Sequence, residues 1–289
     1  MKLLREILRT FKSVIRNILF RFRLTTGKLR VLPDFLIIGA QKAGTTSLYN
    51  YLEKHPYIWS AYSKEVNFFD LNYTKGINWY KSFFPSKLLK FLINIFTDRK
   101  LITGEGSTYY LLHPHVAKRV YNHLPNVKII VLLRNPIYRT FSGYHHSVNT
   151  GLEYLPFNEA IKREEERISQ EFEKIKKNGN YKSKLFPGLA YKTRSIYVNQ
   201  LRSWFEYFPR NQILIIKSED FFRDPQATLN RVYQFLDIPK WELKEFKKFM
   251  AETGQKKIDE EIKTYLSKYF HPYNKELYDL LKNDLGWDN

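Results

Sequence analysis

A short loop between an apolar run and a helical pattern contains the residues best suited to bind an anion. The run 35–39 leads into Lys42 and Gly44, and three hydroxyl residues follow immediately. Backbone N–H groups of such a loop and of the first helical turn point at one spot, where the helix dipole adds positive potential. We therefore expect an anion cradle there, although a sharp turn that binds nothing is the alternative. Its members are Lys42, Ala43, Gly44, Thr45, Thr46 and Ser47.

A second cation follows another apolar run. Arg134 comes directly after the run 127–133, and Pro136 suits the first turn of a helix. The planar guanidinium fork fits a phosphate group, and Ser142 comes eight positions later, about two helical turns on along the same face. The pair is predicted to bind phosphate. A structural salt bridge for Arg134 and a packing hydroxyl for Ser142 are the alternatives.

Two carboxylates are candidates for proton transfer. Glu65 lies just after the strand-like residues 57–61 and just before an apolar stretch, where partial burial would make it a better proton acceptor. The alternative is a surface glutamate paired with Lys64. Glu105 is a second candidate, because it follows another strand-like run.

No metal is expected in this chain. The sequence contains no cysteine, which excludes thiolate-bound metals and disulfides. His145 and His146 are adjacent, so on a helix their side chains point to different faces. A structural role, or a place at the edge of a substrate site, is the interpretation for both.

The loop 39–47 shares the outer glycines of a Walker A motif, but its lysine precedes the second glycine. The segment 64–70 and the segment 133–136, followed by Ser142, complete a set of motifs in a fixed order. Together they resemble the sulfotransferases that use 3′-phosphoadenosine 5′-phosphosulfate (PAPS), especially the carbohydrate branch that contains the heparan sulfate enzymes. The resemblance extends from residue 34 to the C-terminus.

The resemblance implies transfer of a sulfuryl group from PAPS to a hydroxyl or amine, with a carbohydrate or glycoconjugate as acceptor. It implies that Lys42 neutralises the leaving phosphate and that Glu65 is the general base. By the same resemblance the loop holds the 5′-phosphate, and Arg134 with Ser142 holds the 3′-phosphate. Lys256 and Lys257 resemble a basic loop that closes over the donor, or else form a solvated charge pair. A metal-dependent P-loop kinase and a non-catalytic basic protein that binds polyanions or membranes are the alternative functions.

Alternating strand and helix patterns predict an α/β fold, with a P-loop-like parallel sheet flanked by helices on both faces. Residues 32–289 are predicted to form a single domain, because no Gly/Ser/Pro-rich linker divides them. Ligands should gather at the carboxyl ends of the strands. The charged segment 153–184 is interpreted as an exposed helix and loop, and a flap that grips the acceptor is the alternative. The expected strands are 35–39, 57–61, 100–103, 127–133 and 212–217.

Residues 1–31 are predicted to form a basic amphipathic helix, since apolar side chains recur at helical spacing between arginines and lysines over residues 2–23. Charges interrupt every apolar run, so no membrane span is expected. Binding to an anionic membrane surface and packing on the domain or on a partner are equally open alternatives. The formal net charge of +19 favours polyanionic partners. No signature of nucleic-acid binding is present. The predicted location is cytoplasmic, with a peripheral position on the cytoplasmic membrane face as the alternative.

Overall fold

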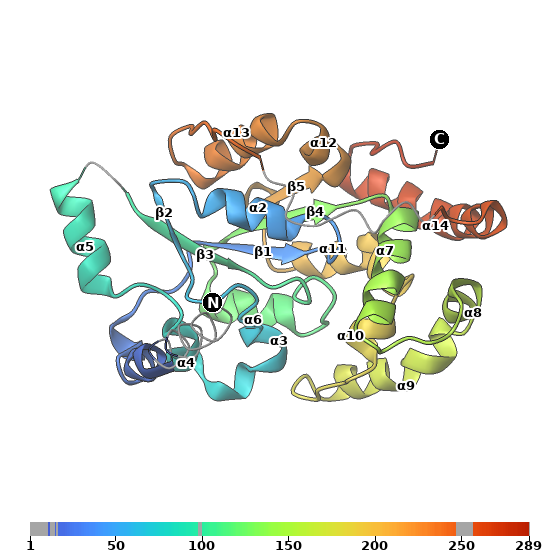
Figure 1. Cartoon of the computed structure of the whole chain (residues 1–289), viewed down its shortest axis with the longest axis horizontal. Helices are drawn as coiled ribbons and strands as arrows, with labels where there is room; N and C mark the ends of the chain where they lie inside the picture. Colours follow the sequence, from blue (N-terminus) through green and yellow to red (C-terminus); the bar gives the residue numbers. More distant parts are fainter. Residues whose placement is uncertain (1–10, 12–14, 16, 98–99, 247–256, 289) are drawn as a thin grey trace, which may run out of the picture.

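The computed structural model describes residues 11, 15, 17–97, 100–246 and 257–288. Within these residues the strands form a five-stranded parallel sheet in the order β2-β3-β1-β4-β5 (Figure 1). The predicted α/β class with a parallel sheet is confirmed. The strands are β1 (Phe35–Gly39), β2 (Ile58–Ser60), β3 (Ile102–Gly106), β4 (Lys128–Leu133) and β5 (Ile213–Lys217).

The three central strands are buried on both faces, which is why their sequences are continuous apolar runs rather than alternating ones. All five residues of β1 and of β3 are buried, as are the last five of β4. Gly104 is required where it stands in β3, because a Cβ there would lie 2.5 Å from the ring of Phe35 on the next strand. The central strands therefore form a rigid platform, and their carboxyl ends lie at one edge of it.

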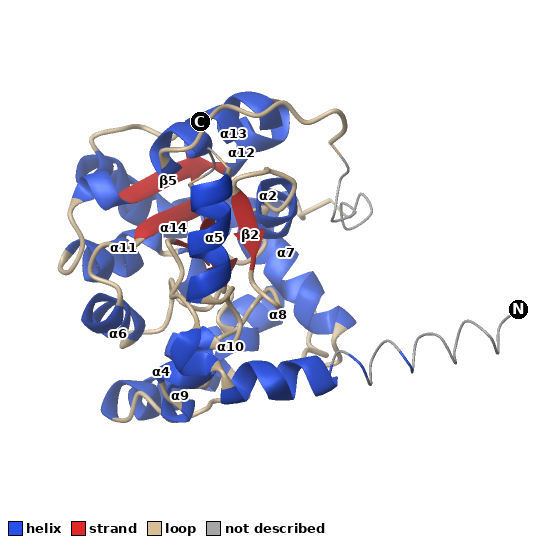
Figure 2. Ribbon diagram, turned by 90° about the vertical axis from the view of Figure 1, so that its left-hand side faces the viewer, coloured by secondary structure: helices blue, strands red, loops and turns tan. Residues whose placement is uncertain are grey.

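Helices cover both faces of the sheet, as predicted. α2, α12 and α13 lie on one face, and α6 and α11 lie on the other (Figures 1 and 2). The helices are α2 (Thr45–Leu52), α3 (Phe68–Leu71), α4 (Ile77–Lys81), α5 (Lys87–Phe96), α6 (Val116–His123), α7 (Pro136–Asn149), α8 (Phe157–Lys162), α9 (Glu164–Lys177), α10 (Phe186–Leu189), α11 (Tyr197–Phe205), α12 (Ser218–Arg223), α13 (Pro225–Leu236) and α14 (Glu260–Leu281). Short 3₁₀ helices lie at Gly27–Leu29, Tyr73–Lys75, Thr193–Ser195 and Arg210–Gln212.

Local sequence signals explain where the key helices begin. α7 starts at Pro136, and the side chain of Asn135 accepts a hydrogen bond from the amide of Ile137. α13 starts in the same way, with Pro225 at its first position and Asp224 as its cap. The cap of α7 fixes the point at which the chain leaves the carboxyl end of β4, and the cap of α13 fixes the turn that follows α12.

The charged segment 153–184 was expected to be an exposed helix and loop, but part of it is buried. It forms α8 and α9, and the inner face of α9 buries Ile168 and Ile175 in a second hydrophobic cluster with Phe186. Glu153 is also buried. The charges that dominate the sequence lie on the outer face of α9, while its inner apolar residues hold this segment against the body.

The C-terminal part of the N-terminal helix packs on the domain. Residues 17–25 are helical, and the ring of Phe20 stacks on Tyr62, with a 5.2 Å separation of the centroids. Arg23 donates hydrogen bonds to the carbonyl oxygens of Ser82 and Phe84. Across the part of the chain that the structure describes, no helix is both long and apolar enough to cross a membrane.

Candidate active site

The loop after β1 has the backbone of an anion-binding turn. Gly44 is the N-cap of α2 and has φ of 93°, in the left-handed region that favours glycine, and a Cβ there would lie 2.8 Å from the ring of Phe222. Lys42 also has a positive φ, 69°. The first-turn amides of α2, at Thr45, Thr46 and Ser47, have no partner inside the helix by geometry. The predicted members of the cradle therefore meet at one helix start.

Two neighbouring strand ends brace this loop. Arg134, which follows β4, donates from Nη1 to the carbonyl oxygen of Lys42 at 3.1 Å. Ser218, which follows β5, donates from Oγ to the carbonyl oxygen of Ala43 at 2.8 Å. The structure thus brings the predicted cations Lys42 and Arg134 together, because β1 and β4 are adjacent and parallel.

Positive charge is concentrated behind the loop. Burial lowers the pKa of Lys42, and the nearby guanidinium groups of Arg134 and Arg139 lower it further. Arg139 is fully buried, and its Nε and Nη1 atoms have no hydrogen-bond partner among the described residues. Burial, with a contribution from Arg139, also lowers the pKa of Arg194 to about 10. A bound polyanion would relieve this repulsion, so the residues present fit an anionic donor.

Glu65 lies beside the loop. Lys64 donates from Nζ to Oγ1 of Thr46 at 3.0 Å and to Oε1 of Glu65 at 3.3 Å. Thr108 donates to the same carboxylate oxygen at 3.4 Å. The side chain of Glu65 is 40% exposed, so the expected partial burial is wrong. The carboxylate is instead held by Lys64, whose ammonium also reaches the anion loop.

Glu105, which lies within β3, has a different environment. Its side chain is fully buried and accepts hydrogen bonds from the hydroxyls of Ser107, Tyr110 and Tyr80. It also accepts from the amide of Val66. These contacts tie the segment that carries Glu65 to β3, and they leave Glu105 out of reach of an acceptor.

Asp70 is a carboxylate at the site to which the sequence assigned no role. It is 3% exposed, and burial raises its pKa to about 7, with smaller contributions from the carboxylates of Glu105 and Glu65. It belongs to the motif 64–70, which was the available signal. Arg194 was also missed, and nothing in its local sequence distinguishes it from a surface arginine.

The other predicted residues lie at varying distances from this centre. Ser142 is buried on α7, two turns from the start of that helix. Burial lowers the pKa of His146, and Lys42 and Arg194 lower it further, which puts His146 near the loop. His145 packs against the ring of Phe141. Lys257 is exposed, and Lys256 lies outside the described residues.

A comparison with known protein families identifies the family of this chain. Residues 32–270 match the family described as the sulfotransferase domain. The chain is a member of the sulfotransferase family. The enzyme class predicted from the three motifs is therefore confirmed.

Individual relatives cover most of this sulfotransferase. It is 32% identical to the membrane-associated sulfotransferase kil1 of Dictyostelium discoideum, over 91% of this chain and 68% of that protein. It is 28% identical to heparan sulfate glucosamine 3-O-sulfotransferase 5 of Mus musculus, over 89% of this chain and 74% of that protein. A human bifunctional heparan sulfate N-deacetylase/N-sulfotransferase 3 is 32% identical over 86% of this chain, which spans 30% of that longer protein.

A solved structure supports the same assignment. The crystal structure of a sulfotransferase from Alicyclobacillus acidocaldarius superposes with a TM-score of 0.67 at 29% identity. The match covers 90% of this chain and 100% of the other. The sulfotransferase fold is therefore shared over nearly the whole length.

Proposed function

We propose that this sulfotransferase takes its sulfuryl group from PAPS and transfers it to a hydroxyl or amine of a glycan. The observation that carries the proposal is the meeting of Lys42, Arg134 and Glu65 at the carboxyl edge of the sheet. Lys42 is part of the anion-binding loop, and Arg134 donates a hydrogen bond to it. Lys64 links the carboxylate of Glu65 to the same loop. An anionic donor and a proton-bearing acceptor need this combination.

The donor residues have separable tasks. The backbone amides of Ala43, Gly44, Thr45, Thr46 and Ser47 hold the 5′-phosphate, as the helix start favours. Arg134 and Ser142 hold the 3′-phosphate. Lys42 provides positive charge beside the departing phosphate oxygen, where negative charge grows. Lys257, which is exposed, is a further candidate for a contact with the donor.

The reaction is an in-line displacement at the sulfur atom of the donor. The acceptor oxygen or nitrogen forms a bond to sulfur while the bond from sulfur to the bridging phosphate oxygen breaks. The electron pair of that bond leaves with the phosphate, beside Lys42. The acceptor proton goes to the carboxylate of Glu65, which Lys64 and Thr108 hold in position.

The acceptor class rests on the relatives. Two of them act on heparan sulfate by name, one at a 3-O position and one at nitrogen. The formal net charge of +19 favours an acidic glycan over a neutral one. A glycan that carries glucosamine residues is therefore the acceptor to test first.

Thermal stability measurements with nucleotides test the donor assignment. We expect 3′-phosphoadenosine 5′-phosphate to raise the melting temperature more than AMP does, because only the former carries the group that Arg134 binds. ATP with Mg²⁺ should have less effect. A larger shift with ATP and Mg²⁺ would favour the kinase alternative, and a shift with heparin together with no shift from either nucleotide would favour a non-catalytic polyanion-binding protein.

A basic membrane-binding arm is the second part of the proposal. Residues 2–23 alternate apolar and basic side chains, and one relative is membrane-associated by name. We propose that this arm binds an anionic membrane surface. The comparisons do not support the predicted cytoplasmic location, which stays a prediction.

A further inference from the structure

Helix α5 exposes an unusual amount of apolar surface. No residue of its ten is buried, and Phe96 and Phe91 are 80% and 59% exposed. The exposed apolar residues fall on one half of the helix when they are placed at 100° per residue. They are Leu88, Leu89, Phe91, Leu92, Ile95 and Phe96.

The other half of α5 attaches the helix to the body. Lys90 forms an ion pair with Asp34 at 2.9 Å, and the side chain of Asn94 accepts a hydrogen bond from the amide of Leu101. Ser86 caps the first turn. Polar contacts thus fix the orientation of the helix, and most of its apolar half faces outward, away from the described residues of the body.

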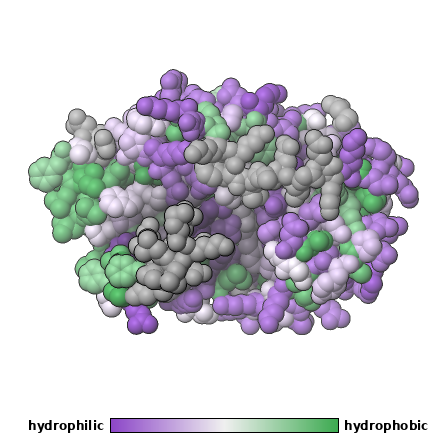
Figure 3. Space-filling view, viewed as in Figure 1, coloured by the Kyte–Doolittle hydropathy of each residue, from purple (hydrophilic) through white to green (hydrophobic). Residues whose placement is uncertain are grey.

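The N-terminal helix borders the same surface. Arg23 and Arg30 donate to carbonyl oxygens in the segment 82–84, which leads directly into α5. Ile18 and Phe22 on this helix are more than half exposed. Figure 2 shows α5 upright on the face toward the viewer, with the N-terminal helix below it. Figure 3 shows apolar side chains gathered at this end of the molecule.

Basic residues predominate in the segments around this apolar surface, and Asp34 is the acidic side chain that pairs with one of them, Lys90. The segments 17–33 and 71–97 each contain four basic residues and no aspartate or glutamate. They are Arg21, Arg23, Lys28 and Arg30 in the first, and Lys75, Lys81, Lys87 and Lys90 in the second. A second copy of the chain would bring the same charges to the same place and would be repelled. An anionic lipid surface complements both the apolar and the basic groups.

We propose that the apolar half of α5 inserts into an anionic membrane surface, with the exposed basic residues around it, such as Arg21, Lys28 and Lys87, contacting lipid headgroups. The inference does not require residues 2–23 to bind lipid. In Figure 1, α5 lies at the opposite end of the molecule from α7 to α10. Membrane contact through α5 therefore leaves the carboxyl edge of the sheet open to an acceptor.

The absence of cysteine from the sequence allows a direct test with a single label. The Phe96→Cys variant of the full chain would be labelled with a polarity-sensitive fluorophore and mixed with phosphatidylcholine vesicles that contain phosphatidylserine. We expect a blue shift of the emission. The Tyr154→Cys variant is a matched control, because Tyr154 is 82% exposed in the segment between α7 and α8, and it should show no shift. Equal spectra for both labels would overturn the proposal.

A second pair of variants measures the contribution of α5 to affinity. Phe91→Ser/Phe96→Ser should weaken binding to the same vesicles by about tenfold or more, since two large apolar side chains are lost. Tyr121→Ser/Tyr154→Ser removes two other exposed aromatic rings and should bind like the parent. Sulfuryl transfer to a soluble acceptor should be unchanged in Phe91→Ser/Phe96→Ser, because neither phenylalanine lies at the active site.

The outcomes separate the possible occupants of this surface. Equal vesicle binding by the parent and by Phe91→Ser/Phe96→Ser would overturn the role of α5 and leave the N-terminal arm as the membrane contact. A parent that sediments as a dimer, and a Phe91→Ser/Phe96→Ser variant that sediments as a monomer with unchanged vesicle binding, would assign the surface to a second copy. Absence of sulfuryl transfer by the parent protein would count against the proposed function instead.

Discussion

Lys42 is held in an environment that penalises its charge until an anion is present. Its ammonium is half-buried near two guanidinium groups, and its pKa is lowered by burial and then by Arg134 and Arg139. Its own carbonyl oxygen accepts a hydrogen bond from Arg134. The loop backbone and the repulsion around it are thus both arranged for a negatively charged ligand, and the residues act as a group rather than singly.

Replacement of Lys42 and of Arg134 should affect different kinetic constants. Lys42→Ala should lower kcat by about 10²-fold or more, because charge stabilisation that appears at the leaving oxygen is lost. Arg134→Ala should mainly raise KM for PAPS and should reduce the preference for 3′-phosphoadenosine 5′-phosphate over AMP. Steady-state kinetics and calorimetric titration measure the two effects. An unchanged preference in Arg134→Ala would show that the 3′-phosphate is bound elsewhere.

Replacement of Glu65 should separate binding from chemistry. Glu65→Gln keeps the size of the side chain but cannot accept a proton, so turnover should fall by roughly 10²–10⁴-fold while donor affinity persists. Lys64→Met is the matched variant, since it removes the ammonium that holds the carboxylate and should give a smaller loss. Turnover close to that of the parent in Glu65→Gln would remove Glu65 from the role of base.

The buried carboxyl of Asp70 should make stability depend on pH. Its pKa is raised from 3.8 to about 7 in the folded protein, chiefly by burial. The folded state therefore holds this proton over a range where the unfolded state has lost it, and stability falls as pH rises from about 4 to about 7. Asp70→Asn removes this effect. The free energy of unfolding of the variant, relative to that of the parent, should therefore increase between about pH 4 and pH 7, by up to about 4 kcal/mol. Urea unfolding of both proteins over this range measures it, and parallel curves would contradict the assignment.

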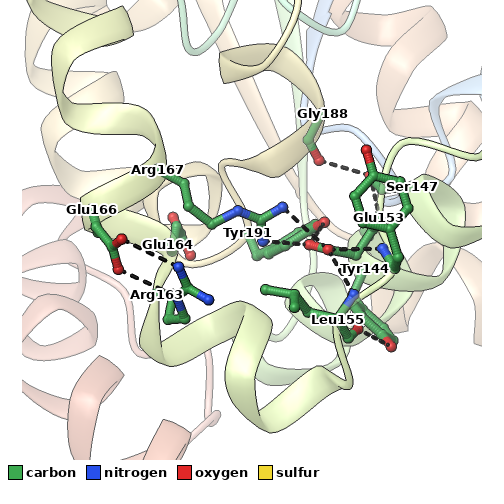
Figure 4. Close-up of polar contacts among 12 residues, drawn as sticks. Tyr144, Ser147, Glu153, Leu155, Arg163, Glu164, Glu166, Arg167, Gly188 and Tyr191 are labelled. Atoms are coloured by element: carbon green, nitrogen blue, oxygen red, sulfur yellow. Dashed lines mark hydrogen bonds and ion pairs between the residues drawn. The ribbon is translucent and has the colours of Figure 1, made fainter.

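At the scale of elements, the insert α8–α9 positions residues of the site from a distance. Glu153 accepts hydrogen bonds from both Nη atoms of Arg167 and from the hydroxyl of Tyr191 (Figure 4). The carbonyl oxygen of Tyr191 accepts a hydrogen bond from Arg139. The carboxylate of Glu164 accepts hydrogen bonds from the backbone amides of Lys192 and Thr193. The insert thus holds the segment that carries Arg194 against α7.

Two glutamates of this insert make a matched pair for a stability test. Glu153→Gln breaks a buried, bidentate ion pair and leaves Arg167 without a charged partner, which should cost about 3 kcal/mol in the free energy of unfolding. Glu166→Gln removes the exposed partner of Arg163, drawn in the same view (Figure 4), and should have little effect. Chemical denaturation measures both. Equal losses would contradict the difference that burial implies.

The strand ends could be predicted from the sequence, and the interior cations could not. An apolar run followed by Gly39 and Lys42, or by Arg134 and Pro136, is a local pattern with a local cause, and both turns lie where they were expected. β3 was predicted at 100–103 but spans Ile102–Gly106, because its glycines interrupt the apolar pattern that identifies a strand. Arg139 and Arg194 gain their positions only from packing between α7 and the insert, which no local pattern records.

The exposure of α5 also escapes the sequence. Its apolar composition is equally compatible with a buried helix, and only the tertiary structure shows that Lys90 and Asn94 bond to the body while the phenylalanines face out. Whether an apolar helix covers the core or a partner depends on which side of it the rest of the chain occupies. The spacing of apolar residues along such a helix does not show what lies against each of its faces.

At the scale of the whole molecule, the packed residues 17–31 and the exposed helix α5 meet at the segment 82–86. Arg30 forms an isolated antiparallel bridge with Ser86, and Phe20 packs against Phe83. Residues 17–31 are therefore part of the packed body. The residues before them contribute five further basic side chains, at Lys2, Arg5, Arg9, Lys12 and Arg16.

Two truncated chains should separate packing from membrane binding. A chain that begins at residue 17 should keep the stability of the full protein and its activity on a soluble acceptor. Its affinity for anionic vesicles should fall by about tenfold or more, because each near-surface lysine or arginine contributes about 1 kcal/mol. The loss should be largest at low salt, where screening is weakest.

A chain that begins at residue 32 should also be less stable, since it lacks the ring of Phe20 and the hydrogen bonds that Arg23 and Arg30 make to the segment 82–84. Thermal unfolding and vesicle flotation of the three proteins measure both effects. Equal vesicle binding by the full chain and the chain from residue 17 would exclude a membrane role for the first sixteen residues. Equal melting temperatures for the chains from residues 17 and 32 would show that the packed helix end, residues 17–31, adds nothing to the stability of the fold.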